Sequence, residues 1–303
     1  MKLEYLVKND NSYKNVNDIL LQEFKFSNRL LVKVIKNNCV YLNNNVCDTR
    51  ILVKKGDIIT VDLGYEEDNS NIIPTKMDLD IIYEDEWLLV LNKPSGVATH
   101  PSCQHFDNSL SNGISYYFKQ IGLKKKIRPI NRLDLHTSGI CMFAKCEYVQ
   151  EILSREMASH DFTKEYTCII EGYLKQREGK LCFPIARKPG SIIEREVPIS
   201  GNGQIAITNY SVLKEFKDDT GNKYSLVKCI LETGRTHQIR VHFSHIGNPL
   251  LGDSLYGNAS DLIPGQALCC TKLSFIHPIT RKNISFEIPF PIPYIFHFTY
   301  FCI

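Results

Sequence analysis

The sequence predicts an α+β protein with a mixed, largely antiparallel central sheet flanked by helices. Short apolar runs typical of strands outnumber the helical stretches, and several of these runs are joined by short turns. A doubly wound parallel sheet would instead alternate its strands regularly with helices. The length of 303 residues suggests about two domains.

The first predicted element is a short helix that Ser27 or Asn28 can cap, because their side-chain oxygens can accept from free backbone N–H groups. Apolar residues fall on one side of this helix, namely Leu30, Leu31, Val34 and Ile35. Three cations spaced at i, i+4 and i+7 share another face, namely Arg29, Lys33 and Lys36.

Two short strands are predicted after this helix, at residues 40–42 and 58–63. A turn of three asparagines follows the first strand, and a Lys-Gly-Asp turn ending at Asp57 leads into the second. The polar, acidic stretch 66–71 is typical of a linker. We therefore expect two domains, residues 1–72 and 73–303.

The second domain is predicted to be rich in strands. Five apolar runs are expected to form them, at residues 87–91, 140–144, 166–170, 226–231 and 284–288. One helix is expected from about Glu147 to Ser159, and another is expected to begin after Thr236 as its cap and to end before Gly247.

The charge of the chain is concentrated near the N-terminus. The formal net charge is only +3, yet residues 25–55 carry seven cations against one anion, a local charge of 7 − 1 = +6. Clustered positive charge is typical of contact with a phosphate backbone. A solvated helix face would give the same pattern, so both interpretations stay open.

Composition argues against several other classes. The charged residues near Met1 interrupt any apolar leader, and no apolar run is long enough to span a membrane, so we expect a cytoplasmic protein without membrane contact. The eleven cysteines are scattered without a C-x-x-C pair and indicate buried thiols in a reducing compartment. His237, His242 and His245 lack the acidic residue of a metalloprotease helix, so no metal is expected.

The most informative segment is residues 131–139, Asn-Arg-Leu-Asp-Leu-His-Thr-Ser-Gly, followed by five apolar residues. An aspartate on a loop that leads into a buried strand is held at the margin of a rigid sheet, where a reactive carboxylate can be presented. Arg132 would favour the ionised form of Asp134. The alternative is a structural turn aspartate bonded to its own backbone, which is common.

This segment resembles the signature of the RluA family of pseudouridine synthases. Three further segments resemble the same family in the expected order: residues 81–101, residues 164–172, and residues 231–257 with the motif Gly-Arg-Thr-His-Gln-Ile-Arg at 234–240. A short Ala-x-Thr-x-Tyr match at 206–210 lies between the last two. The resemblance covers about residues 77–291 and implies the pseudouridine synthase fold.

The resemblance implies that Asp134 is the catalytic residue of a uridine isomerase. It assigns to Arg240 the ion pair that keeps this carboxylate charged. Tyr166, in a predicted strand, is expected to pack against the uracil while its hydroxyl takes part in the reaction; the alternative is a buried core tyrosine. The reaction needs neither metal nor cofactor, because no group is imported and no redox change occurs. The carboxylate can act as a nucleophile or as a base, and the sequence does not choose between them.

The resemblance also implies that RNA is the partner and that the uridine is flipped out of its stack. In the family, the arginine matching Arg132 fills the gap left by the base. Arg235 and His237, within the same motif as Arg240, are expected to contact RNA as well.

The N-terminal helix, hairpin and Gly-Asp turn resemble the αL RNA-binding module known from a small-subunit ribosomal protein. Family members often carry this module, so Arg29, Lys33 and Lys36 are expected to bind RNA. We expect a monomer that acts on large-subunit ribosomal RNA. The alternatives are a synthase that acts on tRNA and a non-catalytic RNA-binding or ribosome-assembly factor with the same fold. A hydrolytic nucleoside or glycoside enzyme is disfavoured, because such sites present two carboxylates and the sequence offers one.

Three departures from the family pattern concern residues without a proposed chemical role. Asn131 stands where the family usually has histidine, His136 stands where an acidic residue is common, and Cys269-Cys270 replaces a His-Ala pair.

Overall fold

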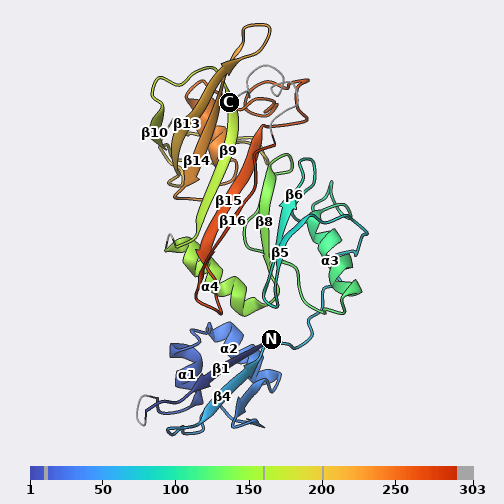
Figure 1. Ribbon diagram of the computed structural model, residues 1–303, viewed down its shortest axis with the longest axis vertical. Coiled ribbons are helices and arrows are strands. Elements are labelled where there is room, and N and C mark those ends of the chain that lie inside the picture. The colour runs from blue at the N-terminus through green and yellow to red at the C-terminus, as the bar shows by residue number, and fades with distance from the viewer. Residues whose placement is uncertain (10–12, 160, 200, 292–303) are drawn as a thin grey trace.

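The computed structural model describes residues 1–9, 13–159, 161–199 and 201–291. Two sheets organise the chain, a four-stranded one near the N-terminus and a ten-stranded one in the remainder, with a third, two-stranded ribbon beside the latter (Figure 1). No helix within these ranges is both long enough and apolar enough to span a bilayer.

The N-terminal unit contains a four-stranded antiparallel sheet in the order β1-β4-β2-β3. Its elements are β1 (Lys2–Leu6), α1 (Val16–Gln22), α2 (Asn28–Lys36), β2 (Val40–Leu42), β3 (Asn45–Val46) and β4 (Ile58–Asp62). The predicted helix is α2, and Ser27 caps it by accepting from the N–H of Leu30 at 3.1 Å. Its apolar face is narrower than expected, because Leu30 and Val34 are buried while Ile35 is 43% exposed.

The larger unit has the predicted α+β architecture, with a mixed and mostly antiparallel sheet. Its main path is β10-β13-β14-β9-β15-β8-β6-β5, and β16 and β7 pair with β15 and β8. The elements in chain order are β5 (Ile81–Glu84), β6 (Leu88–Lys93), α3 (Leu110–Gln120), β7 (Arg128–Pro129), β8 (Ser138–Ala144), α4 (Glu147–Ala158), β9 (Thr163–Glu171), β10 (Glu178–Cys182), β11 (Ala186–Arg187), β12 (Arg195–Glu196), β13 (Ile207–Lys217), β14 (Lys223–Leu231), α5 (Gln238–His245), β15 (Leu268–Ile276) and β16 (Asn283–Glu287).

The five strands predicted from apolar runs are β6, β8, β9, β14 and β16, and the two predicted helices are α4 and α5. The predicted cap of α5 is one residue too early, because His237 and not Thr236 is the N-cap. His237 adopts left-handed backbone angles (φ 58°), which a propensity argument does not anticipate. Helix α3 escapes prediction because Gly113 and two serines lower its helix propensity.

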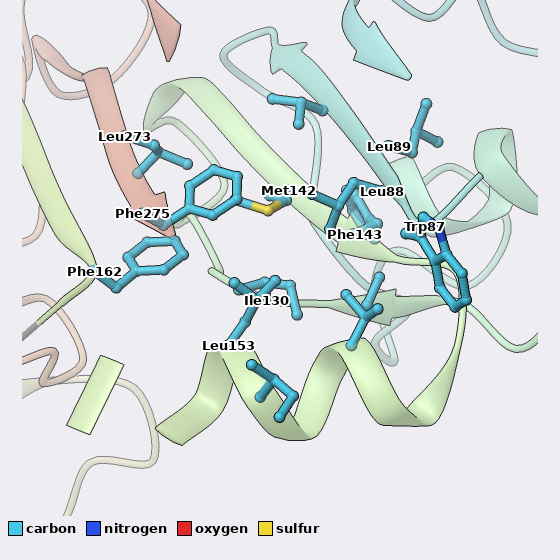
Figure 2. Close-up of a cluster of buried hydrophobic side chains, with 14 of the residues drawn as sticks. Trp87, Leu88, Leu89, Ile130, Met142, Phe143, Leu153, Phe162, Leu273 and Phe275 are labelled. Carbon is cyan, nitrogen blue, oxygen red and sulfur yellow. The ribbon is translucent and has the colours of Figure 1, made fainter. Parts of the chain in front are cut away.

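The main core lies between α4 and the strands above it (Figure 2). Leu153 of α4 points toward Ile130 and the sheet, where Met142 and Phe143 of β8 are fully buried. Phe275 of β15 stacks on a neighbouring phenylalanine with ring centroids 5.6 Å apart. This packing makes β8 a rigid support for the loop that precedes it.

Strands β8 and β15 approach closely at Gly139, where they form the parallel pair of the large sheet. Gly139 has φ +105°, and a Cβ atom there would lie 2.6 Å from the backbone N of Cys270 and would also overlap its carbonyl. Only glycine fits this position, since both the backbone angles and the contact exclude a side chain.

We therefore expect Gly139→Ala to lower the free energy of unfolding by roughly 3 kcal/mol or more, since strained φ and overpacking each cost about 1–3 kcal/mol. Chemical denaturation would measure this loss. Gly190→Ala is the matched control for positive φ, because a Cβ atom there meets nothing within 4 Å. An equal effect of the two substitutions would contradict a role for the close strand contact.

The segment between β4 and β5 differs from the solvated linker that its composition suggests. The Glu67 side chain is only 3% exposed and lies against Lys33 and Arg128. Lys125 donates from Nζ to the carbonyls of Leu63 and Tyr65 at 2.6 and 2.5 Å. The polar composition of this segment predicts a solvent-exposed linker. In the structure the segment is instead fixed, because the buried carboxylate of Glu67 pairs with two cations that are distant in the sequence.

Candidate active site

Asp134 lies on the loop between β7 and β8, and this loop is fixed on one side by buried hydrogen bonds. The hydroxyl of Thr99 donates to the carbonyl of Leu133 at 2.9 Å and accepts from its N–H at 3.2 Å. The amide of Asn131 donates to the carbonyl of Ile140 at 2.9 Å and accepts from the N–H of Met142 at 2.8 Å. Leu133 is buried, so the loop is anchored directly before the aspartate.

The other side of the loop is held by Lys93, which is fully buried. Its ammonium group donates to the carbonyls of Pro94, Val97 and Leu135 at 2.9, 2.6 and 3.0 Å. Burial lowers the pKa of Lys93 to about 8. A partly desolvated ammonium group next to carbonyl oxygens fixes the backbone immediately after Asp134.

The lowered pKa of Lys93 predicts a specific pH dependence of stability. Between pH 8 and about 10.5 the folded Lys93 binds fewer protons than the unfolded one, so its contribution to the free energy of unfolding rises with pH. The unfolding free energy of the wild type minus that of Lys93→Met should rise by roughly 3 kcal/mol across this range. Chemical denaturation at several pH values measures it. A Lys93→Met difference that does not change with pH would contradict the lowered pKa of Lys93.

Arg240, on α5, faces Asp134. Its NH1 lies 3.1 Å from Oδ2 of Asp134, while its Nε and NH2 donate to the two oxygens of Asp253 at 2.7 and 2.8 Å. The Asp253 side chain is fully buried and that of Arg240 is 7% exposed. Despite burial, which opposes it, the bonds to Asp253 and Asp134 raise the pKa of Arg240. A bidentate pair therefore orients the guanidinium toward the loop.

His237 is the second residue near the Asp134 carboxylate, and Tyr256 hydrogen-bonds to His237. His237 Nε2 lies 3.7 Å from Oδ2 of Asp134, and its Nδ1 lies 2.7 Å from the hydroxyl of Tyr256. The Tyr256 ring also covers the guanidinium of Arg240 with 4.9 Å between Cζ and the ring centroid. Burial lowers the pKa of His237, which favours a neutral imidazole.

Tyr166, on β9, forms part of the cavity wall with Asp134 and Arg240. Burial and then the thiol of Cys270 raise the pKa of Tyr166 well above its usual range. Its phenol therefore keeps its proton at neutral pH and can serve as a hydrogen-bond donor or packing surface, but not as a phenolate base.

One open cavity brings together all six site residues that the sequence predicted in the large unit: Arg132, Asp134, Tyr166, Arg235, His237 and Arg240. Arg132 is exposed at its rim, and the ion pair to Asp134 comes from Arg240 instead. Polar contacts of the Asp134 carboxylate within the described residues involve Oδ2, so Oδ1 is available to a substrate. A carboxylate so held suits attack on a carbon or removal of a proton.

The three predicted N-terminal cations do not line this cavity. Arg29 and Lys36 are exposed on α2, and Nε of Arg29 also lies 3.4 Å from Oε1 of Glu147. Lys33 Nζ instead lies 2.7 Å from Glu67 and 2.8 Å from Glu147, between the two units. Its charge is therefore neutralised by carboxylates, which the periodicity of the cations did not reveal.

Sequence reasoning missed residues that hold the site in place. Asp253 lay within a segment that carries the family resemblance, but no role was expected for it. Gln238 was also missed: it accepts from the N–H of Arg235 at 3.0 Å and donates to the carbonyl of Ile207 at 2.9 Å. In His242 both ring nitrogens lie 3.0 Å from protein oxygens, and no cluster of three metal-ligating side chains occurs in the part of the chain that the structure describes.

Comparisons with known proteins agree with this geometry. Residues 87–245 match the family model described as RNA pseudouridylate synthase. The chain is 37% identical over 289 residues to YhcT of Bacillus subtilis, an uncharacterized RNA pseudouridine synthase, covering 95% of this chain and 94% of that protein. It is 34% identical to ribosomal large subunit pseudouridine synthase D of Zymomonas mobilis, covering 88% and 87%.

A solved structure shows the same fold. The human RNA pseudouridylate synthase domain containing 1 superposes with a TM-score of 0.59 at 25% identity, over 70% of this chain and 83% of that one. The fold, the family model and the relatives lead to one conclusion: this chain belongs to the RNA pseudouridylate synthase family and is an isomerase.

Proposed function

We propose that this enzyme converts specific uridines of large-subunit ribosomal RNA to pseudouridine, with Asp134 as the catalytic carboxylate. The observation that supports this most strongly is the Asp134 carboxylate in an open cavity, 3.1 Å from a guanidinium that Asp253 orients. Ribosomal RNA is preferred over tRNA because a relative that matches most of the chain is named for the large ribosomal subunit.

The chemistry is an internal rearrangement. The bond between ribose C1′ and uracil N1 breaks, the base turns, a bond from C1′ to C5 forms, and the proton on C5 moves to N1. Asp134 attacks C1′ as a nucleophile or removes a proton from C2′, and either role requires the ionised carboxylate that Arg240 stabilises. Neither role needs a metal or a cofactor.

In this proposal RNA binds at two places, the candidate active site and the N-terminal unit. Arg132, exposed beside Asp134, fills the stack after the uridine has flipped out, while Arg235 and His237 contact the nucleotide and its neighbours. The N-terminal unit acts as an αL RNA-binding module through Arg29 and Lys36, and Lys33 supports it from the junction with the large unit. A monomer fits this proposal because Asp134, Tyr166 and Arg240 come from one chain, and a ribosomal RNA substrate supports a cytoplasmic location.

Mapping of pseudouridines across all cellular RNAs in a deletion strain tests this function. We expect one or a few pseudouridines to disappear from large-subunit ribosomal RNA, and to return with the wild-type gene but not with Asp134→Ala. Losses confined to tRNA would overturn the ribosomal assignment. Full rescue by Asp134→Ala would indicate a non-catalytic RNA-binding factor.

The proposed RNA contacts of α2 predict a salt effect. Arg29→Glu combined with Lys36→Glu should weaken binding to ribosomal RNA fragments and reduce the slope of log K against log salt by roughly 0.7–0.9 for each phosphate that is no longer neutralised. Filter binding at several salt concentrations measures this slope. Lys119→Glu with Lys217→Glu changes the net charge equally at exposed sites outside α2 and should leave the slope nearer to wild type. Equal slopes for both double variants would contradict an RNA-binding role for α2.

A further inference from the structure

The two units meet at a buried network of charges rather than at a loose hinge. Glu67 Oε1 lies 2.7 Å from Lys33 Nζ and 2.6 Å from Arg128 NH2, and Lys33 also reaches Glu147 at 2.8 Å. The side chains of Glu67, Arg128 and Glu147 are 3%, 7% and 10% exposed. These four residues come from α2, the connecting segment, β7 and α4, and we call them the junction network.

Two members of the junction network, Glu67 and Lys33, are held in their charged forms. Burial opposes ionisation of Glu67, yet the hydrogen bonds from Arg128 and Lys33 outweigh it and lower the pKa of Glu67 to about 2. Burial opposes the charge of Lys33 as well, yet the hydrogen bonds that Lys33 donates to Glu147 and Glu67 raise its pKa. Opening the junction would break these hydrogen bonds between charged groups, which are roughly twice as strong as bonds between neutral groups.

Further contacts join the same two surfaces. The hydroxyl of Ser27 donates to Glu151 of α4 at 2.6 Å, and Arg155 of α4 donates to the carbonyl of Lys25 at 2.7 Å. The rings of Phe26 and Tyr148 pack edge to face with centroids 5.3 Å apart. The apolar cores of both units belong to one continuous cluster of buried residues. Helices α2 and α4 are therefore held in one relative orientation (Figure 1).

The junction and the candidate catalytic residue lie at opposite ends of β8. Asp134 precedes Ser138 at one end of the strand, while Glu147 follows Ala144 at the other. Six steps of a strand span about 20 Å, so the exposed cations of α2 lie at least about this far from the reacting uridine. Arg29 and Lys36 flank Lys33 on the same helix face, so the RNA surface of α2 borders the large unit directly.

We propose that the junction network holds the N-terminal unit in one position relative to the active site. The enzyme then selects uridines that lie at a set distance from a second RNA segment bound by α2. We call the N-terminal unit held in this way the arm. This inference rests on the proposed function, because it requires RNA isomerisation and RNA contact by the N-terminal unit. The ligand is an RNA that extends more than about 20 Å from its target uridine. A short hairpin that carries the uridine alone would reach only the cavity.

Glu67→Ala tests the arm, because it removes the shared partner of Lys33 and Arg128. Glu66→Ala is the matched control, since Glu66 is the neighbouring residue and its pair with Lys124 is exposed at 71% and 67%. Hydrogen exchange without RNA should show roughly 100-fold faster exchange around residues 63–69 in Glu67→Ala but not in Glu66→Ala. Equal exchange in both variants would overturn the rigid junction.

Activity is then compared on two RNAs that carry the same target uridine, a short hairpin and a longer ribosomal RNA fragment with its flanking helix. The wild type should prefer the longer RNA by about 10-fold or more and lose this preference when base pairs are inserted between hairpin and flanking helix. Glu67→Ala should act on the hairpin within about 2-fold of the wild type and be insensitive to the inserted pairs. A spacing preference that survives in Glu67→Ala would overturn the arm.

If Glu67→Ala does not fold, Glu151→Gln replaces it as the test. This substitution weakens the contact between α2 and α4 more mildly, because Ser27 keeps its role as the cap of α2, so a smaller loss of spacing preference is expected.

Two outcomes with the wild type separate the arm from the function on which it rests. No pseudouridine from either RNA with the wild type would overturn the proposed function and the arm together. Normal activity without any spacing preference would overturn the arm alone.

Discussion

Asp134→Asn should abolish pseudouridine formation, with a loss of roughly 10⁴-fold or more, while the protein remains folded. An asparagine has nearly the same shape but is neither a nucleophile nor a base, so both candidate roles of the carboxylate disappear together. The loop should stay in place, because its anchors act through Asn131, Leu133 and Leu135 rather than through the side chain of Asp134. Release of tritium from C5-labelled uridine in RNA measures the reaction.

The control for this substitution is Asp219→Asn, which removes the same charge from an exposed turn between β13 and β14. It should retain activity close to that of the wild type. Thermal unfolding of both variants establishes that any loss is chemical. Activity of Asp134→Asn within about 10-fold of the wild type would exclude this carboxylate from the chemical step.

Asp253→Asn should have the second largest effect and should act through Arg240. The substitution replaces a buried anion that binds Nε and NH2 of Arg240, so the guanidinium is left desolvated and poorly oriented. Breaking a buried pair costs about 3–5 kcal/mol of stability. Displacement of Arg240 from Asp134 should also lower kcat by about 10²-fold, because a misplacement of about 1 Å has this consequence for rates.

Two measurements check this expectation, chemical denaturation for the stability and single-turnover kinetics on RNA for the rate. Glu287→Gln is the matched control, because it breaks the surface pair between Glu287 and Lys272, which are 65% and 38% exposed. The stability of this variant should stay close to that of the wild type. A variant that loses stability but keeps its single-turnover rate would show that Asp253 does not position Arg240 for the reaction.

Much of the large unit was predictable because its strands are short, continuous apolar runs. The runs at β6, β8 and β9 are buried on both faces, so their composition alone indicates strands. Helix α1 and strand β1 were not predicted, because they span only seven and five residues and mix charged with apolar side chains. Elements of this length depend on tertiary packing rather than on a local pattern.

In the candidate site, too, some residues could be predicted from the sequence and others could not. Asp134, Tyr166 and Arg240 were identified from family-like motifs, and the structure brings them to one cavity. The bond between Arg240 and Asp253 could not be anticipated, because the spacing of 13 residues carries no period that would place the two side chains together. For Lys33 the sequence showed its place on a basic helix face but not its partners. The carboxylates that pair with it are 34 and 114 residues away in the sequence.

The carboxamide of Asn131 anchors the loop that carries Asp134 with two neutral hydrogen bonds. A carboxamide neither gains nor loses a proton between about pH 5 and pH 8, whereas an imidazole titrates there. The two bonds that anchor the loop through Asn131 therefore stay the same when the surroundings acidify. Any loss of activity at mildly acidic pH would have to begin at another place than this anchor.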